Sequence, residues 1–182
     1  LTIDDGPIDD SKEKIDFLWR VIGRFDFYIN STNTKAAFLI TFNTFLLGLA
    51  ANSWESLLKP YSDPQTKKYA TYLLILIVTA ALVSLVFTFC VVNPYLATSK
   101  KFGEYHSSVF FGDIAEYPDG EVYRKNVQTE NSDRHIRDLA YQAHILAKGA
   151  CGKFAKIKHA ITAIIFIELP AIFIFLVLRL DG

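Results

Sequence analysis

The chain has 182 residues, 51% of them hydrophobic, and its formal net charge is zero. This length suits one domain, or one small domain with membrane segments, and a neutral chain has no general field to attract a nucleic acid polymer. The two cysteines, Cys90 and Cys151, lie far apart and form no CxxC pair, so nothing indicates a disulfide framework.

The N-terminal segment, residues 1–35, is expected to be cytoplasmic and to contain an amphipathic helix over residues 12–30. Asp10 or Ser11 can cap the start of this helix. Its apolar residues follow at spacings of three and four, as on one face of a helix: Ile15, Leu18, Ile22, Phe25 and Ile29. Nothing after residue 30 forces a break, so the helix can continue into the apolar run that follows.

Three apolar runs predict transmembrane helices at residues 36–54, 70–92 and 160–179. A bilayer core of about 30 Å needs about 20 helical residues, and the second run meets this length without a charge. The first run is the most polar, with Asn43 and Thr44, and we expect it to pack against the other two. Three core helices of a soluble bundle are the alternative, which the lack of a polar face in the second run disfavours.

Most of the 19 basic residues lie in residues 1–35 and 93–159. Two predicted membrane helices separate these segments, so both segments lie on the same side of the membrane. The positive-inside rule therefore places both segments in the cytoplasm.

The segment 93–159 is expected to be a cytoplasmic helical region and a candidate ligand-sensing region. Pro118 and Asp119 mark the start of a short helix through Gln128, and "FFGDIAEY" suggests one or two helical turns before it. A longer helix from Asp133, capped by Asn131 or Ser132, should run unbroken into the third span. Its apolar stripe contains Ile136, Leu139, Ala143, Leu146, Ala150, Phe154 and Ile157. The predicted fold class is thus an all-α membrane protein.

Motifs for catalysis and metal binding are missing from the sequence. There is no HExxH, no histidine pair at i, i+4, no GxSxG, no P-loop and no GxGxxG. We therefore expect no enzyme activity, no metal and no cofactor.

Basic and aromatic residues of the segment 93–159 form a candidate site for a phosphate-bearing ligand with a base. Arginine offers phosphate a bidentate fork, and aromatic rings can stack a base. The candidate residues are Arg134, Arg137, Lys148, Phe110, Phe111 and Tyr117. Core packing of the aromatic residues is the alternative. Three further lysines, Lys153, Lys156 and Lys158, are expected on a solvated face near membrane lipid.

One acid, Glu168, lies within the third run, two residues before Pro170. An ionisable residue inside a span is a functional-site hypothesis by default. Glu168 can line or gate a polar pathway, or meet Asn43 and Thr44 across a helix interface. The alternative is a protonated carboxyl that is hydrogen-bonded for packing. Pro170 removes a backbone donor and permits a kink.

Three stretches together resemble the small transmembrane effectors of Pycsar antiphage systems. They are "NTKAAFLITFNTFLLGL" (33–49), "SSVFFGDIAEYPDGEVYRK" (107–125) and "DLAYQAHILAKGACGKFAKIKHAI" (138–161). The resemblance implies that a partner cyclase makes cyclic UMP or cyclic CMP on infection. It also implies that the effector binds this nucleotide and impairs the bacterial inner membrane, in an abortive infection.

Because three short spans make a poor pore, we expect a homo-oligomer that forms a pore or disrupts the bilayer. Two other functions stay open from the sequence. The chain can be a membrane anchor or scaffold that recruits a cytoplasmic partner through residues 93–159. It can also be a subunit of a small regulated ion channel.

Overall fold

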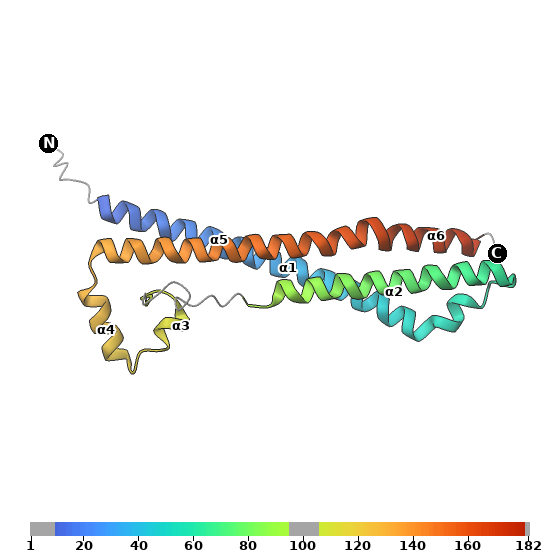
Figure 1. Ribbon diagram of the computed structural model, residues 1–182, viewed down its shortest axis with the longest axis horizontal. Helices are drawn as coiled ribbons and strands as arrows, with labels where there is room; N and C mark the ends of the chain where they lie inside the picture. Colours follow the sequence, from blue (N-terminus) through green and yellow to red (C-terminus); the bar gives the residue numbers. More distant parts are fainter. Residues whose placement is uncertain (1–9, 95–105, 181–182) are drawn as a thin grey trace, which may run out of the picture. The chain divides into compact units, whose positions relative to one another are not determined.

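The computed structural model describes residues 10–94 and 106–180, and the predicted segments 1–35 and 93–159 extend beyond these described residues. The described part is all-α, as predicted, and Figure 1 shows its helices. Three helices are long and apolar enough to cross a membrane. The elements in chain order are α1 (Asp10–Leu58), α2 (Pro64–Val92), α3 (Phe111–Ile114), α4 (Gly120–Thr129), α5 (Ser132–Ala163), the π-helix η2 (Ile164–Glu168) and α6 (Leu169–Leu180).

The described chain divides into two compact units. Unit 1 comprises residues 10–29 and 106–151, and unit 2 comprises Asn30–Pro94 and residues 152–180. Helices α1 and α5 each contribute to both units, because neither helix ends where one unit ends. No proline lies at either position, and α5 continues through Gly152.

Unit 1 is held by an apolar cluster between the first part of α1 and the first part of α5. Ile22 of α1 and Leu139 and Ala143 of α5 are buried at its centre. Partly buried neighbours complete the cluster: Ile15, Leu18, Val21, Phe25, Val109 and Leu146. The amphipathic spacing of both helices is therefore confirmed over these residues.

Local capping follows the sequence closely in unit 1. The Asp119 side chain accepts hydrogen bonds from the backbone N–H groups of Glu121 and Val122 at the start of α4. The side chain of Asn131 accepts from the backbone N–H of Arg134 at the start of α5. Asn131, rather than Ser132, is thus the N-cap residue, and "FFGDIAEY" gives the single turn α3.

Unit 2 is a bundle of the three membrane-spanning helices. Its core combines α1 (Ala50, Leu58), α2 (Ala70, Leu74, Ile77) and α6 (Ala171, Phe175). The outward side chains are also large and apolar, and they include Phe45, Val86, Phe166 and Phe173. Helices that are apolar all round need an apolar solvent, which is the hydrocarbon core of a membrane.

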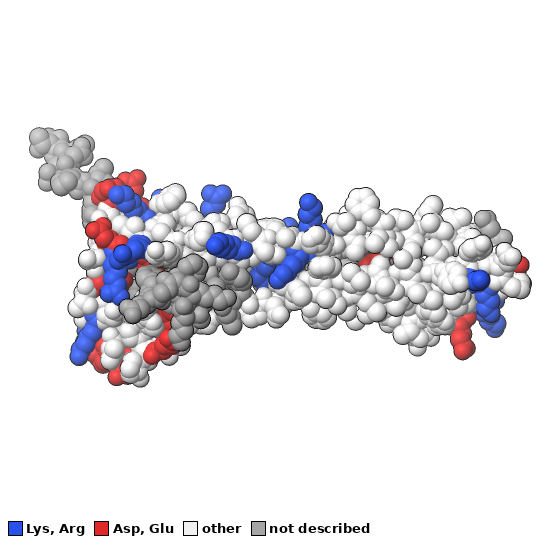
Figure 2. Space-filling view, viewed as in Figure 1, with Lys and Arg blue, Asp and Glu red and all other residues white. Residues whose placement is uncertain are grey.

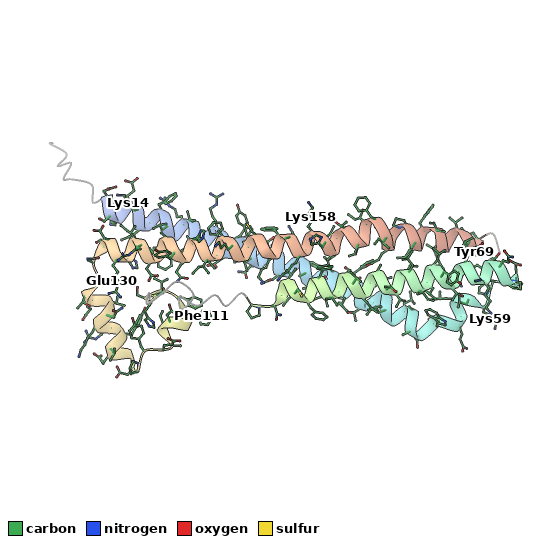
Figure 3. The ribbon with its side chains drawn as sticks, in the orientation of Figure 1. Lys14, Lys59, Tyr69, Phe111, Glu130 and Lys158 are labelled. Carbon is green, nitrogen blue, oxygen red and sulfur yellow. The ribbon has the colours of Figure 1, made fainter. Side chains whose placement is uncertain are left out.

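Charged side chains flank this apolar bundle. Figure 2 shows few of them on the visible face over the middle of unit 2, between charged groups at either end. In Figure 3, Lys59 and Tyr69 lie near one end of the bundle and Lys158 lies towards the other. The apolar band between them is the expected position of the bilayer.

The helix that begins at Ser132 continues into the third span, as predicted, but one π-helical segment, η2, interrupts its α-helical geometry. Between α5 and α6 the chain forms η2, and the N–H of Leu169 donates to the carbonyl of Ile164, five residues earlier. Pro170 follows directly, with no N–H of its own and with a ring that clashes with a preceding carbonyl in a regular helix. The wider π-turn accommodates this proline inside the span.

Two predictions for α5 are wrong. Phe154, placed on the apolar stripe, has 43% of its surface exposed, whereas Lys153, placed on a solvated face, is only 6% exposed. The side chain of Lys153 finds acceptors inside unit 2, so that burial does not leave its charge without partners. These polar partners have outweighed the apolar periodicity at this position.

Candidate functional site

Polar side chains run through the interior of the unit 2 bundle. Asn43 of α1 is fully buried, and its Nδ2 donates to the Oγ of Ser84 at 3.1 Å and to the carbonyl of Leu39 at 2.8 Å. The hydroxyl of Ser84 donates to the carbonyl of Ala160 at 3.4 Å, and that of Thr88 to the carbonyl of Ser84 at 2.6 Å. These bonds connect α1, α2 and α5. We call Asn43, Ser84 and Thr88 the polar seam.

Glu168 is fully buried at the end of η2, yet neither of its carboxylate oxygens has a hydrogen-bond partner in the described chain. Buried polar groups are nearly always hydrogen-bonded, and an unpaired one costs free energy. The hydrogen-bonded packing alternative is therefore not what the structure shows. Glu168 is the buried ionisable group that most needs a functional explanation.

The expected meeting of Glu168 with Asn43 and Thr44 does not form. Asn43 is engaged with Ser84, which bonds to Ala160, and Ala160 lies about two helical turns before Glu168. Thr44 is exposed on the outside of the bundle. The sequence could place these residues in two spans, but not at the same depth.

Buried carboxylates fasten the segment before α3 in unit 1. Asp138 accepts hydrogen bonds from the Oγ of Ser107 at 2.7 Å and from the N–H of Ser108 at 2.8 Å. Asp113 accepts from the N–H of Ser107 at 2.8 Å, and Glu130 accepts from the Oγ of Ser108 at 2.7 Å. The sequence does not predict this network, because its only local signal is a Ser–Ser pair and most of its acidic partners are far along the chain.

These carboxylates are engaged by hydrogen-bond donors of the segment that they hold. Their oxygens accept from the serine donors, and no group of three metal-ligating side chains occurs within residues 10–94 and 106–180. The hydroxyl of Tyr123 also donates to the carbonyl of Ser108 at 2.8 Å. The network therefore holds residues 107–113 against α4 and α5.

The predicted basic ligand residues share one face of α5. Arg134, Arg137 and Lys148 are all exposed, and at 3.6 residues per turn they fall within an arc of about 60°. Arg134 also lies 3.5 Å from the carboxylate of Glu130. Figure 3 shows Glu130 beside the start of α5. The structure thus places the three cations on one face of α5, with Arg134 and Arg137 one turn apart and Lys148 about 16 Å further along the helix axis.

The aromatic ligand residues form two pairs in unit 1. Phe110 and Phe111 have ring centroids 4.8 Å apart, and Phe111 is 66% exposed. Tyr117 contacts Tyr123, with ring centroids 5.3 Å apart. Burial raises the pKa of Tyr117, while the charge of Arg134 lowers it. Tyr117 is therefore partly a core residue, whereas Phe111 keeps a free ring face.

Comparison with known proteins agrees with this architecture. The family model described as "PycTM: Pycsar effector protein domain" matches residues 17–180. The Pycsar effector protein EcPycTM from Escherichia coli is 26% identical over 157 residues, which cover 85% of each chain. No solved structure matches the chain. The chain therefore belongs to the PycTM family, and it is a membrane effector of antiphage defence.

Proposed function

We propose that this effector is a homo-oligomer of the bacterial inner membrane that impairs membrane integrity when it binds a cyclic pyrimidine nucleotide. Cyclic UMP and cyclic CMP are the candidate ligands. Unit 1 is the cytoplasmic, ligand-sensing part, and unit 2 is the part that opens a polar path through the bilayer.

The observation that carries this proposal is the unpaired carboxylate of Glu168. In the bundle of one chain it is 0% exposed and has no hydrogen-bond partner within the described residues. An arrangement that brings this group into contact with water removes the penalty of its burial. The buried Glu168 thus lowers the stability of the resting bundle relative to an arrangement in which its carboxylate is hydrated.

The polar seam supports the same mechanism. Asn43, Ser84 and Thr88 are buried where three spans meet, in helices whose outer surfaces are apolar. Three helices leave no room for a water-filled channel among them, so a path needs several chains. Rotation of the helices in an oligomer would turn the seam and Glu168 towards a shared lumen.

The ligand-sensing role of unit 1 is supported by its exposed cations. Arg134, Arg137 and Lys148 lie on one face of α5, and a cyclic nucleotide carries one phosphate that an arginine can bind with two hydrogen bonds. The exposed ring of Phe111 offers a stacking surface for a base.

Dye-filled liposomes containing the purified full chain test the membrane activity. We expect cyclic UMP or cyclic CMP to start dye release, and Glu168→Gln to change its rate because the ionisable group is lost. Glu55→Gln is the matched control, since Glu55 is exposed at the end of α1. Equal release from Glu168→Gln, in an equally folded protein, would count against a role for Glu168 in the path.

Calorimetry tests the binding surface separately. Arg137→Ala should weaken nucleotide binding about tenfold or more, since it removes a charge-assisted hydrogen bond. Lys12→Ala, an exposed cation of α1, should leave the affinity unchanged. Unchanged affinity in Arg137→Ala would remove this residue from the site.

A further inference from the structure

One cation, Lys153 of α5, is buried in unit 2 with only 6% of its surface exposed. Its Nζ donates to the carbonyl of Val91, to the carbonyl of Asn93 at 3.2 Å and to the Oδ1 of Asn33 at 3.1 Å. Val91 and Asn93 lie at the C-terminal end of α2, and Asn33 belongs to α1. One side chain of α5 therefore joins all three spans.

A cation stabilises the C-terminal end of α2. The last carbonyls of a helix lack partners inside the helix, and the helix dipole makes that end negative. The last turn of α2 contains no basic residue of its own. Lys153 supplies the missing charge, and Lys156 adds a weaker bond from its Nζ to the carbonyl of Cys90 at 3.3 Å.

The position of Lys153 also allows its ammonium group to move from the bundle interior to the membrane surface. Lys156 and Lys158, one turn further along α5, are exposed, so this part of α5 lies where a cation can reach water or lipid phosphate. A lysine has a long flexible stem that can carry its charge to the membrane surface. The same side chain thus has one set of partners inside the bundle and another outside it.

We propose that Lys153 is the clasp that holds the three spans in their resting arrangement, and that activation of the effector releases it. The release step rests on the proposed function, whereas the clasp itself does not. Lys153 is a positioning residue: it acts through the ends of α1 and α2 and needs no contact with a ligand.

The test measures the distance between α2 and α5 directly. Spin labels are attached at Phe89→Cys and Ala155→Cys, both exposed, in the full chain with Cys90→Ser and Cys151→Ser, reconstituted in lipid nanodiscs. Without nucleotide, Lys153→Met should broaden and lengthen the distance distribution. Lys153→Arg, which can donate to the same carbonyls, should keep it close to that of the unsubstituted Lys153 protein. Lys158→Met is the matched control and should have no effect.

Liposome leakage gives the functional readout. Lys153→Met should leak about tenfold faster than the unsubstituted protein without nucleotide, because charge-assisted hydrogen bonds of the resting state are lost. Should Lys153→Met be unstable in detergent, Asn33→Ala removes one acceptor and should shift the distances and the leakage in the same direction, by less.

The outcomes separate the clasp from the proposed function. Unchanged distances in folded Lys153→Met and in Asn33→Ala would overturn the clasp. Longer distances in Lys153→Met support it even where no protein leaks with cyclic UMP or cyclic CMP, a result that would contradict the proposed function alone. Leakage of the Lys153 protein on nucleotide addition, at an unchanged distance, would overturn the release step.

Discussion

Two buried carboxylates, Asp138 in unit 1 and Glu168 in unit 2, have opposite surroundings. Asp138 is 1% exposed and accepts hydrogen bonds from Ser107 and from the N–H and Oγ of Ser108. Glu168 is 0% exposed and has no such partner in the described chain. The hydrogen bonds of Asp138 stabilise the fold of unit 1, whereas the unpaired carboxylate of Glu168 destabilises the resting bundle of unit 2.

This difference predicts effects of opposite sign on stability. Removing a satisfied acceptor leaves buried donors without partners, which is destabilising. Replacing an unsatisfied buried acid with an apolar side chain removes a penalty instead.

Asp138→Ala should lower the free energy of unfolding of unit 1 by about 3–5 kcal/mol, because it breaks several bonds to a charged group at once. Hydrogen exchange of residues 106–114, followed by mass spectrometry, measures the change locally. Asp16→Ala, an exposed acid of α1, is the control and should change little. A loss below about 1 kcal/mol would show that the serine segment is held by other contacts.

Glu168→Met should raise the free energy of unfolding of unit 2 by about 1–3 kcal/mol, the cost of a buried polar group without a hydrogen-bond partner. The same change should reduce nucleotide-triggered leakage. Unfolding in mixed micelles measures the stability, with Glu55→Met as the exposed control. A destabilised Glu168→Met protein would mean that the carboxylate has a partner in the membrane, and the contrast with Asp138 would disappear.

Asn43→Leu tests the polar seam and should destabilise unit 2 by roughly 0.5–1.5 kcal/mol, since one hydrogen bond between spans is typically of this size. Thr44→Leu is a neighbouring control whose side chain is exposed, so its effect should be near zero. Equal effects from the two substitutions would indicate that Asn43 contributes only its volume.

The smallest effect concerns Asp63, the N-cap residue of α2. Hydrogen bonds from the N–H and Oγ1 of Thr66 lower the pKa of Asp63 below its ordinary value of 3.8. The charged form of Asp63 therefore stabilises the start of α2 at pH values above its ordinary pKa. This contribution is lost as the pH falls through the lowered pKa of the folded protein. Asp63→Ala should thus differ from the unsubstituted protein at neutral pH and converge with it in acid. A pH-independent difference would contradict this.

Much of the fold follows from patterns that are local in the sequence. Apolar periodicity predicted the α1 and α5 faces in unit 1, long apolar runs predicted the three spans, and Asp119 and Asn131 predicted helix starts. The resemblance to Pycsar effectors supplied the family, which the comparisons confirm over residues 17–180.

What the sequence could not give depends on contacts between distant residues. Lys153 is buried because acceptors more than 50 residues earlier lie beside it, and Ser107 meets Asp138 across 31 residues. Nothing near these residues in the sequence reveals such partners. The depth of Asn43 relative to Glu168 likewise follows from the packing of whole helices, which the residue types alone do not fix.

Water access beside Glu168 decides whether η2 reaches a lumen. Ile164→Cys, at a buried position of η2 one turn before Glu168, leaves the carboxylate in place; in a chain with Cys90→Ser and Cys151→Ser it is treated in vesicles with a membrane-impermeant thiol reagent, with and without cyclic UMP or cyclic CMP. We expect no labelling of the resting protein and rapid labelling once the nucleotide is added. Labelling that is equal in both states, or that is missing while the vesicles leak, would contradict this expectation.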